Sequence, residues 1–177
     1  MNRIVILAIA CLLVLPVTTW GQTRSRTTTR RATQTKTSKA SAEQAAAEVK
    51  TNGATKVADQ VKILTKFLYL LGGAAKGIEQ IDEAARKNEA SPTAIEQNNR
   101  NKATVKTSLQ NVREGLDQLE VYFRSTPELE QYYLKLAGSA SGAATAEDQA
   151  AAGHFDQAGR TLLQVVNRLT DVLLTMR

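Results

Sequence analysis

The chain is poor in the residues on which most enzymatic chemistry depends. Its 177 residues include one cysteine, Cys11, and one histidine, His154. Cys11 lies in an N-terminal apolar run that we expect to be removed, which would leave no thiol for disulfides, nucleophilic catalysis or metal binding. A nucleophile activated by a base would have to use His154, and no pattern marks a serine as its partner. These shortages argue against an enzyme, and we predict no catalytic, cofactor or metal site.

Acidic residues are absent from the first 40 positions. The segment 22–40 is rich in threonine and has nothing large to bury, so we expect it to be a disordered linker. Of the 23 basic residues in the chain, Arg3 and six linker residues precede position 41, which leaves 16 against the 17 acidic residues beyond. The net charge of +6 is therefore a property of the N-terminal segment. The six linker cations are Arg24, Arg26, Arg30, Arg31, Lys36 and Lys39.

A cationic strip of this kind suits an anionic surface, such as acidic lipid headgroups or an envelope polysaccharide. No aromatic residue is interleaved with the arginines, so specific nucleic-acid recognition is not expected. The alternative is a solvated spacer that keeps the folded domain away from a membrane.

Residues 1–21 have the form of an export signal. Arg3 precedes an apolar run, and small residues at Thr19 and Gly21 suit cleavage after Gly21. The protein is then exported, to a bacterial periplasm or to the extracellular space. An uncleaved anchor is the alternative, because the arginines after the run oppose the usual charge bias. The run of about 14 residues is shorter than the roughly 20 needed to span a bilayer, which favours cleavage.

Apolar residues at alternating steps of four and three predict helices packed side by side. The first such seam is Val57, Val61, Leu64, Leu68, Leu71, Ala75 and Ile78. The second is Val105, Leu109, Val112, Leu116, Leu119 and Phe123. A shorter seam is Leu129, Tyr133, Leu136 and Ala140. The last is Phe155, Leu162, Val166, Leu169, Leu173 and Met176, broadened by Val165 and Val172. Residues 41–177 are therefore expected to form an all-α, antiparallel bundle of about four main helices.

Turn residues divide the helices. Asn52-Gly53 is either a break or a weak point in the first helix, and a new helix is expected at Ser91-Pro92. The sequence Ser125-Thr126-Pro127 predicts a helical hairpin, and the glycines 138 and 142 weaken or end the helix that follows. A short helix is expected at 146–152. The sequence AAAGHFDQAGRTLL resembles the hairpin turn of tetratricopeptide repeats; no second unit lies about 34 residues away, so only a tight hairpin is implied.

The glycines 72, 73 and 77 allow two interpretations. One is a close helix crossing, which we favour, and the other is a kink beside a pocket. Ile63, Phe67 and Leu70 flank the seam and indicate that more than one neighbour covers this helix. The acidic residues 79, 82 and 83 are interpreted as a solvated face, and the polar segment 96–102 is expected to project from the core.

Four aromatic residues are expected to converge near Pro127: Tyr122, Phe123, Tyr132 and Tyr133. Core packing at one end of the bundle explains them, and the alternative is an amphipathic patch for a partner or an apolar ligand. The function that these patterns favour is non-enzymatic association at the cell envelope, with a second copy or an unidentified protein partner. The alternative is a bundle that binds a small apolar ligand or haem through His154.

Overall fold

A computed structural model describes the backbone of residues 30–177 and the side chains of residues 40–177. In that part of the chain every regular element is helical, which confirms the all-α prediction. The elements are α1 (Arg30–Arg86), α2 (Pro92–Ser125), the short 3₁₀ helix η1 (Pro127–Leu129), α3 (Glu130–Leu136), α4 (Ser139–Ala151) and α5 (Phe155–Thr175). Residues 39–177 form one compact unit.

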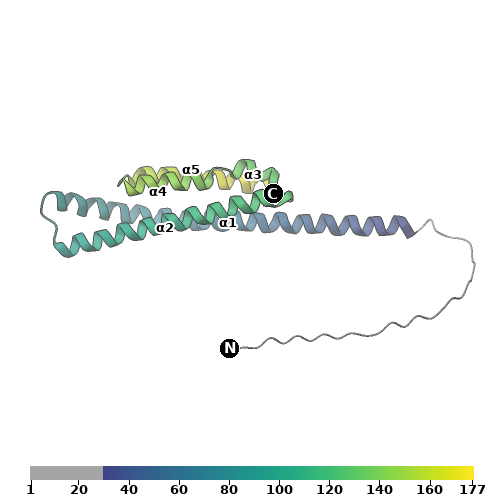
Figure 1. Cartoon of the computed structure of the whole chain (residues 1–177), viewed down its shortest axis with the longest axis horizontal. Coiled ribbons are helices and arrows are strands. Elements are labelled where there is room, and N and C mark those ends of the chain that lie inside the picture. Colours follow the sequence, from purple (N-terminus) through teal and green to yellow (C-terminus); the bar gives the residue numbers. More distant parts are fainter. Residues whose placement is uncertain (1–29) are drawn as a thin grey trace, which may run out of the picture. The chain divides into compact units, whose positions relative to one another are not determined.

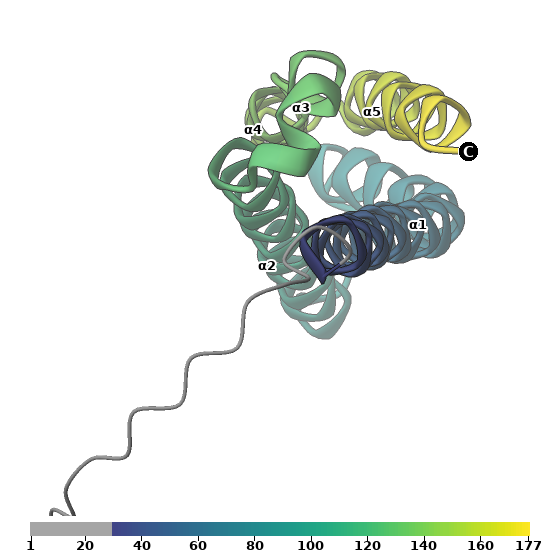
Figure 2. The same cartoon turned by 90° about the vertical axis from the view of Figure 1, so that its right-hand side faces the viewer.

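The helices of this unit form a bundle in which sequential neighbours run antiparallel (Figure 1). Gln60 of α1 lies against Gly115 of α2, and Gln149 of α4 accepts a hydrogen bond from Thr161 of α5. In this bundle η1, α3 and α4 follow one another in the same general direction and together pair with α2 on one side and α5 on the other. Seen end-on in Figure 2, α1 has α2 on one side and α5 on the other, and α3 and α4 lie across from it.

Most residues of the predicted seams are buried in the hydrophobic core. All six predicted residues of α2 are buried, and so are Val57, Leu64, Leu71, Ala75 and Ile78 of α1. The centre of the α5 seam is displaced by one residue. Val165 and Val172 are buried, whereas Val166 and Leu173 pack against the core from its edge. The spacing therefore identified the core of the two longest helices, and the flanking valines replace two predicted positions in α5.

Two helix C-termini, those of α1 and α4, are capped by the same backbone hydrogen-bonding motif. Glu89 N–H donates to Ala84 O after α1, and His154 N–H donates to Gln149 O after α4. In each case the residue before the donor has a positive φ, 58° at Asn88 and 83° at Gly153. This is the Schellman motif, for which glycine and asparagine are preferred. At the start of α2 the Ser91 hydroxyl accepts from Ala94 N–H, as the predicted cap requires.

Helix α1 runs through Asn52-Gly53 without a break, which is one of the two alternatives that the sequence left open. Leu129 and Met176 fill the space there, and packing offsets the cost of the glycine. Gly138, with φ of 87°, ends a helix as the sequence allows. Two helix starts differ from the sequence predictions. Helix α4 starts at Ser139, ahead of the short helix expected at 146–152, and helix α1 begins at Arg30, so residues 30–40 are helical where the sequence predicts disorder.

The N-terminal predictions fall largely on residues that are not described. The signal segment 1–21, Arg24 and Arg26 lie outside the described residues. Arg30, Arg31, Lys36 and Lys39 belong to α1, and their side chains are not described. Within residues 30–177, no helix combines the length and the apolar character that crossing a bilayer requires.

Close helix packing occurs at α4 and not at the glycines of α1. Helix α4 buries Ser139, Ala143, Ala146 and Ala150, and these small side chains let the backbones of α2 and α5 approach closely. A Cβ built on Gly142 would lie 2.7 Å from Val165 Cγ2. A Cβ on Gly72, Gly73 or Gly77 would meet nothing within 4 Å. The prediction of a close helix crossing at residues 72–77 is therefore wrong: no other helix in the described part of the chain approaches these glycines closely.

We predict opposite effects for alanine at two glycines. Gly142→Ala should lower the free energy of unfolding by roughly 1 kcal/mol, because overpacking against buried Val165 outweighs the gain of about 1 kcal/mol in helix propensity. Gly72→Ala should raise it by about 0.5–1 kcal/mol, because only propensity changes. Urea denaturation followed by circular dichroism measures both. Equal stabilisation by the two substitutions would show that α4 is not closely packed.

Candidate functional site

Helix α1 carries a second apolar stripe beside its buried seam. We call it the outer stripe, and its members again alternate by four and three: Ile63, Phe67, Leu70, Ala74, Gly77 and Ile81. None of the six is buried; Ile63 is 49% exposed and Leu70 57%. Ile63, Leu70 and Gly77 are exposed, while Phe67, Ala74 and Ile81 are partly buried. Exposed apolar residues grouped in this way on a core helix mark a candidate contact surface.

Helix α2 provides an uncharged wall beside the outer stripe. Phe67, Leu70 and Ala74 border a groove of about 190 Å³ between α1 and α2, with Leu71 and Val105 also lining it. On the α2 side the groove is lined by Asn101, Thr104 and Ser108. The same face of α2 continues without a charge in both directions, and its members are Gln97, Asn101, Thr104, Ser108, Asn111, Gly115 and Gln118. We call this series the α2 wall.

Two neighbours, α2 and α5, lie against α1, as the breadth of its apolar surface predicts, but they leave Ile63 and Leu70 exposed. Ile63, Phe67 and Leu70 do flank the seam as predicted. Helices α2 and α5 pack against the two sides of α1 that lie nearest the seam, and the outer stripe lies beyond the α2 side. On the α5 side, Leu68 and Gly72 line a second groove with Gly159 and Leu163. The apolar signal was present in the sequence, but only the helix positions show that it faces outward.

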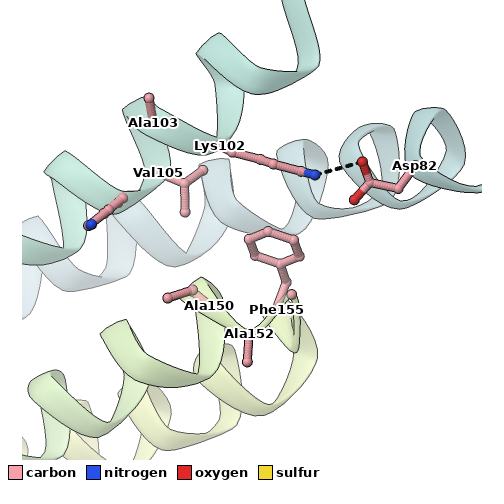
Figure 3. A pocket seen from close by; sticks show the side chains of 10 residues that line it. Asp82, Lys102, Ala103, Val105, Ala150, Ala152 and Phe155 are labelled. Atoms are coloured by element: carbon pink, nitrogen blue, oxygen red, sulfur yellow. Dashed lines mark hydrogen bonds and ion pairs between the residues drawn. The ribbon is translucent and has the colours of Figure 1, made fainter. Parts of the chain in front are cut away.

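A polar cluster ties α1 to α2 near their connecting loop (Figure 3). Lys102 Nζ lies 2.6 Å from Asp82 Oδ1, with the two side chains 39% and 35% exposed. Asn98 is 4% exposed, and its Nδ2 donates to Asp82 Oδ1 at 2.7 Å and weakly to Ile78 O at 3.4 Å. Asn98 Oδ1 is buried and receives no hydrogen bond from the described residues. Asp82 thus accepts from two donors on α2.

The sequence does not indicate this cluster. It predicts a solvated face for Asp82 and a projecting segment for Asn98, yet both lie at the contact between the helices. The signal that could have found them is their similar distance from the loop, because antiparallel helices place such residues opposite each other.

The polar cluster borders a groove of about 430 Å³ that reaches the turn between α4 and α5. Figure 3 shows the Phe155 ring from α5 beside the Asp82 and Lys102 pair, with Val105 and Ala150 farther along. Lys106 adds a second cation. The groove therefore offers an apolar ring, the ammonium group of Lys102 beside the Asp82 carboxylate, and a second cation, Lys106, elsewhere in its lining.

The four aromatic residues near Pro127 serve mainly in packing. Phe123 is fully buried, and its ring meets Tyr122 edge-on, with centroids 6.0 Å apart. Lys56 Nζ lies 5.1 Å from the centroid of the Tyr122 ring. Tyr132 and Tyr133 are half-buried against the core. Tyr133 also lines a surface groove of about 560 Å³ with Leu134, which is 80% exposed. The patch hypothesis is thus limited to the exposed edges of three tyrosines.

Other chemical groups are few. His154 is exposed at the N-terminus of α5, and its side chain makes no cap hydrogen bond. Within residues 30–177, no three histidine, cysteine, aspartate or glutamate side chains gather where they could hold a metal ion. No protein-family model, curated protein or solved structure matches the chain.

The polar cluster leads to a prediction for a double-mutant cycle. Asp82→Ala and Asn98→Ala should be coupled by about 1.5–2 kcal/mol in the free energy of unfolding, because a buried amide loses its charged acceptor. Asp82→Ala and Lys102→Ala should be coupled by less than about 1 kcal/mol, because that pair is solvated. Urea denaturation of the single and double variants measures both couplings. A larger coupling to Lys102 than to Asn98 would contradict the assignment.

Proposed function

We propose that this protein is an exported, non-enzymatic association module of the cell envelope. Its bundle binds another protein chain through the outer stripe of α1. Its basic N-terminal segment contacts an anionic surface.

The exposed outer stripe is the observation that carries this proposal. Burying an apolar surface contributes about 25 cal/mol per Å², and side chains such as Leu70 and Ile63 leave much of that contribution unused in the isolated chain. The adjacent α2 wall has no charge that a partner would have to desolvate, and its amides and hydroxyls can hydrogen-bond to a partner. A chain that meets this face therefore gains apolar burial without burying a charge of the wall.

The distribution of charge supports the second part of the proposal. The bundle is almost neutral, with 16 basic residues against 17 acidic ones beyond position 40, while the six linker cations are concentrated within 16 positions. Each cation near an acidic surface contributes on the order of 1 kcal/mol, and salt weakens the attraction. The bundle is then free to use its apolar face for a protein partner.

Photocrosslinking in the producing cells tests the association. A photoreactive phenylalanine analogue at Ile63, an exposed member of the outer stripe, should give a discrete adduct of higher mass. The same analogue at Leu134, exposed on α3, should not. In addition, Leu70→Lys should reduce the Ile63 adduct at least tenfold, because a charge would be buried in the contact. Failure to form any adduct at Ile63, with normal export of the variant, would remove the proposed function.

Binding to vesicles tests the basic segment. Changing the six linker cations to glutamine should abolish binding to vesicles that contain acidic lipids, while leaving the helical circular dichroism of the bundle unchanged. Binding of the original chain should weaken as salt is raised from 0.05 to about 0.5 M, since the screening length shortens. Vesicles of neutral lipid serve as the control. Binding that is indifferent to the six substitutions would show that the segment is only a spacer.

A further inference from the structure

The pattern of residues along α1 also identifies the partner. We propose that the outer stripe binds the outer stripe of a second copy of this chain, antiparallel, with the two-fold axis level with residue 72. This inference rests on the proposed function and names the chain that the bundle binds.

Large and small residues of the outer stripe are arranged to complement each other in this orientation. With the axis level with residue 72, Phe67 of one copy faces Gly77 of the other, Leu70 faces Ala74, and Ile63 faces Ile81. The described chain leaves open space around Gly73 and Gly77, where a Cβ would meet nothing within 4 Å. A phenyl ring over Gly77 fills that space, and Gly73, on the flank of the stripe near the axis, has no side chain to hold the helices apart. A parallel arrangement would place Phe67 on Phe67 and leave Gly77 facing a gap.

The charges beside the stripe follow the same rule. In the same register, Asp59 of one copy lies within two residues of the level of Lys87 of the other, and Lys62 within one residue of the level of Glu83, an offset of about 3 Å or less that these side chains can bridge. All four are exposed, and within the chain they make only local pairs, Lys62 with Asp59 at 3.0 Å and Lys87 with Glu83 at 2.8 Å. A parallel pair would oppose Lys62 to Lys62 and Lys66 to Lys66, which is repulsive. Charge complementarity therefore selects the antiparallel orientation.

The α2 wall completes the contact. Helix α2 lies beside α1 on the flank that carries Phe67, and Phe67, Leu70 and Ala74 border the outer groove with Thr104 and Ser108. Two hairpins placed face to face about the axis would enclose both outer stripes between two α1 helices and two α2 walls. The paired segment from Asp59 to Lys87 is about 42 Å long at 1.5 Å per residue. Such a length is comparable to that of the hairpin itself, so the contact extends along most of the exposed apolar face.

Sedimentation equilibrium and cysteine crosslinking test the proposal. All variants carry Cys11→Ser, and the chain is used as isolated from the producing cells. We expect a dimer at micromolar concentration, and Leu70→Lys should weaken dimerisation at least tenfold without changing the helical signal. Leu134→Lys is the matched control and should leave the dimer intact, because Leu134 is exposed on α3. A short bis-maleimide should link Gly73→Cys chains to each other far better than Lys76→Cys chains.

Orientation is measured with two further cysteines. A mixture of Asp59→Cys and Lys87→Cys chains should give the mixed crosslinked dimer in at least fivefold excess over either homodimer. Asp59→Lys should weaken dimerisation, and adding Lys87→Asp should restore it. A chain that stays monomeric at about 100 μM, or preferential crosslinking of Asp59→Cys to itself, would overturn the antiparallel dimer. A monomeric chain that still gives the Ile63 photoadduct with a different protein would overturn the dimer alone and leave the proposed function standing.

Discussion

Side-chain size at the helix contacts sets the architecture of this bundle. Helix α4 presents serine and alanine to both neighbours, so α2 and α5 lie close to it. Helix α1 presents leucine, isoleucine and valine, which hold its backbone farther from α2 and α5. The result is an asymmetric bundle with grooves along both sides of α1 and with the outer stripe exposed beside one of them.

The polar cluster at the loop end of the α1 and α2 hairpin complements this packing. Leucine-type contacts at regular spacing tolerate a shift of one helix along the other, whereas a buried asparagine bonded to one carboxylate does not. Asn98 keeps a buried acceptor without a partner among the described residues, so the cluster is not the arrangement of greatest stability. We infer that the polar cluster fixes the register of α1 against α2. This register places the outer stripe beside the α2 wall.

The proposed function follows from surfaces and not from a reactive centre. The outer stripe is apolar, the α2 wall is polar but uncharged, and the excess of positive charge lies before position 41. The two proposed contacts therefore use different surfaces of the chain. Salt would weaken the contact of the basic segment more than that of the outer stripe, since the second depends mainly on apolar burial.

The sequence by itself determined that the chain from position 41 on is mainly helical and which residues are buried at the centre of α1 and α2, because the spacing of apolar residues along a helix is a local property. It also located the cap at Ser91 and the turn at Gly153, where a single residue type satisfies the backbone. Only the tertiary structure decided that α4 is the closely packed helix, that Asn98 bonds to Asp82, and that Ile63 and Leu70 remain exposed. These outcomes depend on which helix lies opposite each face and at what distance, and no local pattern contains that information.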